Sequence, residues 1–293
     1  MIIAGHTMGT PEHTVPEALE LFARLGLEAA EVIWQEGYRC GLDPATDVST
    51  LQTIRRHAER AGVPIVALTP YEASFNDLDP QRRRDAIDAY SRALEAAPIL
   101  GARWLRLYAG RFLPGDDRWD EKWACLVDAL QELGSRAQRV GAVICVENHF
   151  NTMADTAART AALVRAVDHP HVRVLYDQPN LGFIGAEPWE EALRVLAGLI
   201  AYVHVKDFVF TDPTRPFSAR DVSHVEAEAR IVRSRVVGEG IVPWPQILSA
   251  LREQGYDGVL SLEYERRWHP EDLPPAEEGM ARGAARLRQW LAT

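Results

Sequence analysis

The sequence predicts an α/β protein folded as a single (β/α)8 TIM barrel over residues 1–293. Eight short apolar runs rich in β-branched residues alternate with longer segments of helical period, a pattern typical of parallel strands joined by helices. The runs show little polar alternation, as expected for strands covered on both faces, and 293 residues is the usual size of one such barrel. The rival architecture, a doubly wound open sheet, usually carries a Gly-rich phosphate loop after its first strand, and GHTMGT at 5–10 matches that loop poorly.

The predicted strands are spaced regularly enough for a helix to follow each one. They lie at residues 2–5, 29–34, 64–69, 103–108, 142–147, 172–177, 201–207 and 258–264. The first helix is expected to open at Thr14 or Pro16, residue types favoured at helix N-termini. Several helices are expected to end at glycine, the usual residue after a helix C-terminus, as at Gly26, Gly62, Gly101 and Gly255.

One connection is longer than the others. Residues 208–240 separate the seventh strand from the next helix, which begins near Pro243. A long loop on the active-site face of a barrel often covers the substrate or sets specificity. We therefore expect an insertion after strand seven; the alternative is an insertion without contact to the chemistry.

Composition narrows the class of protein. A net charge of −10 and a pI near 5.4 argue against a nucleic-acid partner. Three widely separated cysteines form no CxxC pair, which argues against a disulfide framework or a thiolate zinc site. The N-terminal residues lack the pattern of a signal peptide, and no apolar run is long enough to span a bilayer. We expect a cytoplasmic protein without a membrane partner.

Metal-competent side chains occur at the ends of the last four strands. They are Glu147, Asp177, His204 and Glu263. Side chains at the carboxyl ends of barrel strands converge on the mouth of the barrel. Each residue alone is more often a helix cap, a salt-bridge partner or a core histidine, but the coincidence at four successive strands favours a metal site. Three carboxylates and one imidazole suit one octahedral divalent ion, Mn²⁺ first, with Mg²⁺, Co²⁺ or Zn²⁺ as alternatives.

The motifs VENH, YDxxN, HVKD and GEG, followed by GYDGxxSLEYE, resemble the xylose isomerase-like TIM-barrel superfamily, which contains the sugar phosphate isomerase/epimerase family. The resemblance spans essentially the whole chain. It implies that Glu147, Asp177, His204 and Glu263 bind a single metal. Members often carry a substrate-contacting His three residues after the strand-six Asp; Asn180 stands at that position here, a departure from the ketose 3-epimerase pattern.

Strand parity adds candidate substrate contacts. Lys206 shares a face with His204, and His149 shares one with Glu147, because side chains alternate along a strand. For Lys206 a salt bridge to Asp207 or a neighbouring Glu is an equally good interpretation. Weaker candidates, for which packing or surface solvation is the simpler interpretation, are His6, Tyr108, Arg111 and Arg235.

These residues predict a metal-dependent isomerase or epimerase. Glu147 and Glu263 come from opposite ends of the ligand arc, so they are expected to act as the catalytic base and acid around a metal-stabilised enediolate. The expected partner is a sugar or a cyclic polyol ketone, and barrels of this kind commonly form homo-oligomers. The alternatives are a lyase of the inosose or 3-dehydroshikimate dehydratase type and a non-catalytic sugar-binding protein. An endonuclease IV-type nuclease would need more His ligands and a basic surface.

Overall fold

The strands close into the predicted barrel. The computed structural model describes residues 1–185, 187–215, 217 and 230–292. In this part of the chain eight parallel strands form the wall, and β1 pairs with both β2 and β11, which closes the ring. In chain order they are β1 (Ile2–His6), β2 (Ala29–Trp34), β4 (Ile65–Pro70), β5 (Trp104–Tyr108), β6 (Val143–Glu147), β7 (Val172–Tyr176), β8 (Ile200–Val205) and β11 (Val259–Leu262). A short strand, β3 (Gly41–Leu42), pairs with the carboxyl end of β2.

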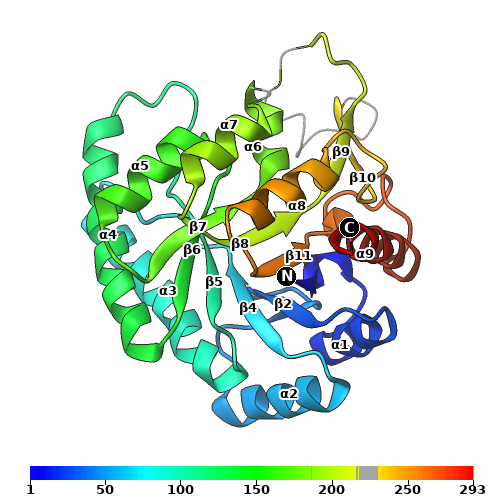
Figure 1. Cartoon of the computed structure of the whole chain (residues 1–293). Coiled ribbons are helices and arrows are strands. Elements are labelled where there is room, and N and C mark those ends of the chain that lie inside the picture. Colours follow the sequence, from blue (N-terminus) through cyan, green and yellow to red (C-terminus); the bar gives the residue numbers. More distant parts are fainter. Residues whose placement is uncertain (186, 216, 218–229, 293) are drawn as a thin grey trace.

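Helices lie outside the ring of strands (Figure 1). They are α1 (Val15–Arg24), α2 (Val48–Ala61), α3 (Pro80–Leu100), α4 (Trp119–Val140), α5 (Ala157–Val167), α6 (Gln178–Gly185), α7 (Trp189–Leu196), α8 (Trp244–Glu253) and α9 (Ala276–Leu291). Thr14 precedes α1, as predicted, and its N–H donates to Glu17. Gly62 and Gly101 follow α2 and α3 in the left-handed conformation. Within the described residues, no helix combines the length and apolar character that a membrane crossing requires.

The interior of the barrel has an apolar lower layer and a polar upper layer. Cys145 and Tyr202 belong to an apolar cluster contributed by several strands. Glu147 and His204 lie two residues further along the same strands, so they face the same interior. Both are fully buried. The alternation of the strand therefore places ionisable groups on an apolar floor, where their charges are poorly screened.

The seventh barrel strand is shorter than predicted. β8 ends at Val205, and Asp207 begins β9 (Asp207–Phe210), which pairs in antiparallel fashion with β10 (Val232–Arg235). The Asp207 carboxylate accepts the N–H groups of Phe208, Gly238, Gly240 and Val242. These bonds hold residues 238–242 against the start of β9 and turn the chain away from the barrel. Residues 218–229, within the long connection singled out from the sequence, lie outside the described part.

Candidate metal centre and active site

Four side chains from neighbouring strands meet at the upper end of the barrel. Glu147 ends β6, Asp177 follows β7, His204 lies in β8 and Glu263 follows β11. One ligand atom from each lies within 4.8 Å of the others. The Nδ1 atom of His204 is 3.5 Å from Glu147, 3.9 Å from Asp177 and 3.3 Å from Glu263. The structure thus brings together all four residues predicted as metal ligands.

The chemistry of this cluster fits a divalent cation. His204 Nδ1 is buried and has no hydrogen-bond partner among the described residues, although three carboxylates surround it. The buried groups here comprise four carboxylates, Glu31 included, and two fixed cations, Arg106 and Lys206. With a neutral His204 this leaves two negative charges, which one dication balances. Oxygen and nitrogen ligands bind such ions at about 2.0–2.6 Å, a reach compatible with donor atoms this close together.

Glu31, which the sequence did not single out, orients the histidine. Its carboxylate lies 3.1–3.2 Å from Nε2 of His204 and accepts the hydroxyl of Thr69 at 2.5 Å. Burial alone would raise the pKa of Glu31, but His204 and His6 lower it, so the group is a carboxylate. Nε2 of His204 therefore carries the proton that Glu31 accepts, and Nδ1 is the nitrogen left for a metal.

Replacing Glu31 by Gln is expected to weaken Mn²⁺ binding about 10–100-fold, because the amide no longer fixes the histidine tautomer. Titration calorimetry of the metal-free protein measures the affinity directly. Glu20→Gln, at a position whose side chain is 58% exposed, is the matched control and should bind as the wild type does. Unchanged affinity in Glu31→Gln would show that His204 is oriented by other contacts.

Arg106 pairs with Glu147 inside the barrel. The Arg106 Nε donates to Glu147 at 2.5 Å, and the guanidinium stacks on Tyr108 with 3.4 Å between Cζ and the ring centre. Burial disfavours an ionised Glu147, but Arg106, His204 and His149 together outweigh it and lower the pKa of Glu147 to about 2. Glu147 is therefore a carboxylate at neutral pH. Arg106 lies in the middle of β5, whereas the sequence pattern indicated candidate residues at strand ends.

Lys206 bridges the other two carboxylates. Its ammonium is 2.7 Å from Glu263 and 2.9 Å from Asp177. Burial opposes its charge, but these two carboxylates raise the pKa of Lys206 well above its usual value. Asp177 behaves differently: burial raises its pKa to about 7, against the influence of Lys206. Asp177 is thus the carboxylate of the cluster that most readily holds a proton.

Metal affinity should consequently fall as the pH is lowered through 7. Asp177 must ionise to bind a cation, and His204 must release the ring proton whose pKa Glu263 and Glu31 raise in spite of burial. Protons therefore compete with the metal, and below pH 7 the apparent Kd for Mn²⁺ should rise at least about tenfold per pH unit. Calorimetric titrations between pH 5.5 and 8 measure this. An affinity independent of pH in this range would contradict the assignment of these ligands.

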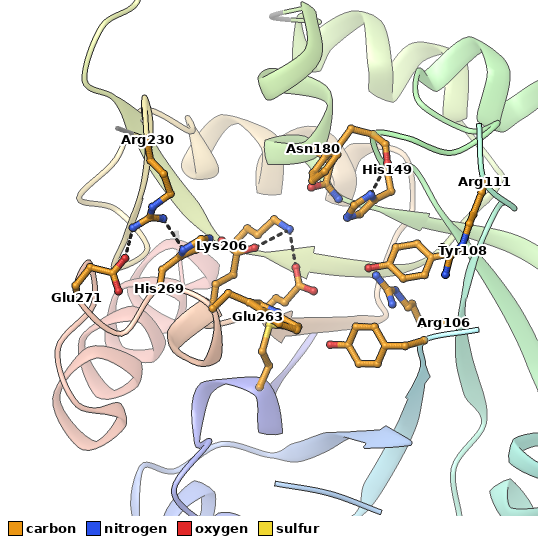
Figure 2. A pocket seen from close by; sticks show the side chains of 15 residues that line it. Arg106, Tyr108, Arg111, His149, Asn180, Lys206, Arg230, Glu263, His269 and Glu271 are labelled. Atoms are coloured by element: carbon orange, nitrogen blue, oxygen red, sulfur yellow. Dashed lines mark hydrogen bonds and ion pairs between the residues drawn. The ribbon is translucent and has the colours of Figure 1, made fainter. Parts of the chain in front are cut away.

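A cavity of about 630 Å³ lies over the cluster. Figure 2 shows Lys206 and Glu263 in the middle of this cavity. Arg111 lies at one end of the cavity, and Arg230, His269 and Glu271 lie at the other. Five predicted substrate contacts line it: Tyr108, Arg111, His149, Asn180 and Lys206. Arg230, His269 and Glu271, which the sequence did not mark, line it too, as does Glu265.

His149 and Asn180 present hydrogen-bonding atoms near the cluster. His149 Nδ1 donates to the Phe150 carbonyl at 2.8 Å, and burial lowers the pKa of His149 to about 4. The ring is therefore neutral at pH 7, with Nε2 as an acceptor. The Asn180 amide donates to Glu147 at 3.2 Å, while its Oδ1 is buried without a partner among the described residues. Asn180 thus both holds Glu147 and offers an acceptor.

Two predicted substrate contacts are not among the described residues that line the cavity. His6 is fully buried beneath it, where its ring bonds Thr69 and accepts the N–H of Met8. Arg235 ends β10 and donates to the Ser234 carbonyl. Arg230, two residues before this strand, lines the cavity instead and bonds His269 and Glu271.

Comparison with known proteins shows likeness in sequence and in fold. Curated inosose dehydratases of Lacticaseibacillus casei and Geobacillus thermodenitrificans (strain NG80-2) are 28% and 30% identical over 149 and 150 residues. The match covers 50% of this chain, and the chain spans about half the length of these relatives, 48%. A D-psicose 3-epimerase solved with D-fructose has a TM-score of 0.76 at 19% identity, covering 100% of both chains. The IolI protein with a bound zinc atom has a TM-score of 0.77 at 19% identity, covering 100% of this chain and 98% of its own.

These structural likenesses, at such low identity, concern the fold. The family assignment rests on a sequence model. The model described as "Xylose isomerase-like TIM barrel" matches residues 19–290, nearly the whole barrel. The chain therefore belongs to the xylose isomerase-like TIM-barrel family.

Proposed function

We propose that this protein is a divalent-metal-dependent isomerase or epimerase that acts on a small polyhydroxy carbonyl compound. The observation that carries the proposal is the cluster of Glu147, Asp177, His204 and Glu263, whose ligand atoms lie within 4.8 Å of one another. Its three oxygens and one nitrogen favour Mn²⁺. The zinc and the magnesium named for two structural neighbours make Zn²⁺ and Mg²⁺ the competitors.

The proposed chemistry is proton transfer at the carbon beside a carbonyl. A bound cation would supply Lewis acidity to the carbonyl oxygen. Glu147 and Glu263 both have pKa values below the usual range in spite of burial, owing to Arg106 beside the first and to His204 and Lys206 beside the second. Both are therefore bases in the resting site. The proton returned to the product comes from the carboxyl group that has accepted one, or from the Lys206 ammonium that bonds Glu263.

A second candidate function is dehydration of an inosose or a 3-dehydroshikimate-type substrate. The named activity of the curated relatives favours it. The first proton abstraction is the same in both reactions. In dehydration, however, the acid protonates a departing hydroxyl, for which the Lys206 ammonium at the cavity wall is placed.

Turnover in D₂O separates the two candidates. We would incubate the Mn²⁺-loaded protein with ketoses, inososes and 3-dehydroshikimate and follow the products by NMR. Isomerase or epimerase action places solvent deuterium on carbon in a product of unchanged formula, whereas dehydration gives a conjugated product that has lost water. About one metal per chain by elemental analysis is expected in parallel. No turnover of any of these compounds by fully loaded protein would overturn the proposal in favour of a non-catalytic binding role.

The remaining expectations stay predictions. They are a cytoplasmic location, a homo-oligomeric assembly, one domain over residues 1–293 and an insertion that shapes the substrate site after the seventh barrel strand.

A further inference from the structure

A second cavity, also of about 630 Å³, lies beside the one over the metal-ligand cluster. The two cavities have two wall residues in common, Tyr71 and Arg111. The second cavity is bounded by the carboxyl ends of β2 and β4 and by helix α3, and it includes Trp34 and Tyr90. The two cavities therefore adjoin at Tyr71 and Arg111.

Arg111 has a fixed backbone and a free side chain at this junction. The buried amide of Asn76 accepts its N–H and donates to its carbonyl, both at 2.9 Å. Gly110, at φ +68°, permits this close approach, since a Cβ there would lie 2.4 Å from Cγ of Asn76. Among the described residues the Arg111 guanidinium has no hydrogen bond or ion pair. The fold therefore holds an unpaired cation between the two cavities.

The lining of the second cavity suits a neutral hydroxylated ring. Its cations are Arg92 and Arg111, and its carboxylates are Glu36, Asp43 and Glu72. A phosphate or carboxylate would meet these three acidic groups, whereas sugar hydroxyls both donate and accept. The wall also contains Trp34, which is 4% exposed and whose N–H, a donor only, has no partner in the described structure.

We propose that the substrate carries a second neutral sugar or polyol ring, attached to the unit that bears the reactive carbonyl. This ring occupies the second cavity, where Arg92 and Arg111 donate to its hydroxyls and Glu36 accepts from them. The inference rests on the proposed function, because it places the carbonyl unit over the metal-ligand cluster. It narrows the substrate class from a free monosaccharide to a glycoside or disaccharide.

Fructose and three of its glycosides test the proposal. Isomaltulose, turanose and lactulose carry the same ketose with a second ring at O6, O3 or O4. Calorimetry with Mn²⁺-loaded full-length protein should show at least one of them binding about tenfold or more tightly than fructose. Arg92→Gln and Glu36→Gln, both changes of exposed residues, should each reduce that advantage at least about threefold, the loss of a hydrogen bond. Neither should alter the Kd of fructose.

Three outcomes would overturn the second-ring site. The first is that no disaccharide binds more tightly than fructose, and the second is that no disaccharide binds at millimolar concentration. The third is that Arg92→Gln and Glu36→Gln weaken the binding of fructose and of the disaccharide equally. Deuterium exchange in D₂O, recorded on the same samples, keeps this test separate from that of the enzyme. Tighter binding of a disaccharide that depends on Arg92, without deuterium exchange on any sugar, would support the second-ring site and contradict the isomerase function. Deuterium exchange on fructose, with no binding of any of the three disaccharides, would support the isomerase function and contradict the second-ring site.

Discussion

Replacing Glu147 or Glu263 by Gln is expected to reduce turnover by at least about a thousandfold, within the range that general acid–base groups contribute. Both side chains are almost fully buried, and both have lowered pKa values, so each is a carboxylate in the resting site and able to accept a proton. Gln keeps the size and one ligand oxygen but cannot exchange a proton. The rate of deuterium incorporation or water loss, measured by NMR at saturating Mn²⁺, reports the effect.

The metal content of each variant must be measured alongside, because both residues are also predicted ligands. A variant that loads Mn²⁺ fully and still loses activity has lost proton transfer; one that fails to load has lost the cation. Glu12→Gln, at a side chain 57% exposed, is the control and should retain wild-type turnover. Either Glu147→Gln or Glu263→Gln keeping more than a tenth of the activity would remove that residue from the acid–base pair.

The ligand cluster was predictable from the sequence because barrel geometry converts position in a strand into position in space. Glu147, Asp177 and Glu263 lie at strand ends, where a parallel barrel collects its side chains at one rim. Lys206 was predicted to face the same way as His204 and does reach Asp177 and Glu263, although the strand ends one residue before it. The sequence pattern of a single strand was therefore sufficient to predict the position of a side chain wherever that strand alone determines its direction.

Residues whose role depends on a partner from a distant element were not predictable in this way. Glu31 and Arg106 lie in the middle of apolar runs. Their function appears only when Glu31 of β2 meets His204 and when β5 pairs with β6, the strand that Glu147 ends. A charge within a strand covered on both faces was nevertheless a usable signal, because burying it requires a partner. Arg235 was predicted as a substrate contact, but Arg230 of the same segment lines the cavity. The sequence contains no comparable signal for the direction of these side chains.

Arg106→Leu is expected to lower the free energy of unfolding by about 3–5 kcal/mol, the range for removing one partner of a buried ion pair. The side chains of Arg106 and Glu147 are 2% and 0% exposed. Without the guanidinium, Glu147 keeps the cost of burial without its main compensating charge, so its pKa should rise. The loss should therefore be larger at pH 8 than at pH 5, where protonation relieves the unpaired carboxylate. Urea denaturation of the metal-free protein at both pH values measures this.

The double variant Arg106→Leu/Glu147→Leu shows whether the loss comes from the pair or from packing. If the unpaired charge is the cause, removing both partners should recover most of the stability, since a well-packed apolar pair is often no less stable than a buried ion pair. Arg103→Gln, an exposed position directly before β5, should change stability by no more than about 0.5 kcal/mol. A double variant as unstable as Arg106→Leu, with no dependence on pH, would mean that Arg106 stabilises the barrel through its stacking on Tyr108. Recovery would mean that the unpaired carboxylate of Glu147, and not the loss of packing, destabilises Arg106→Leu.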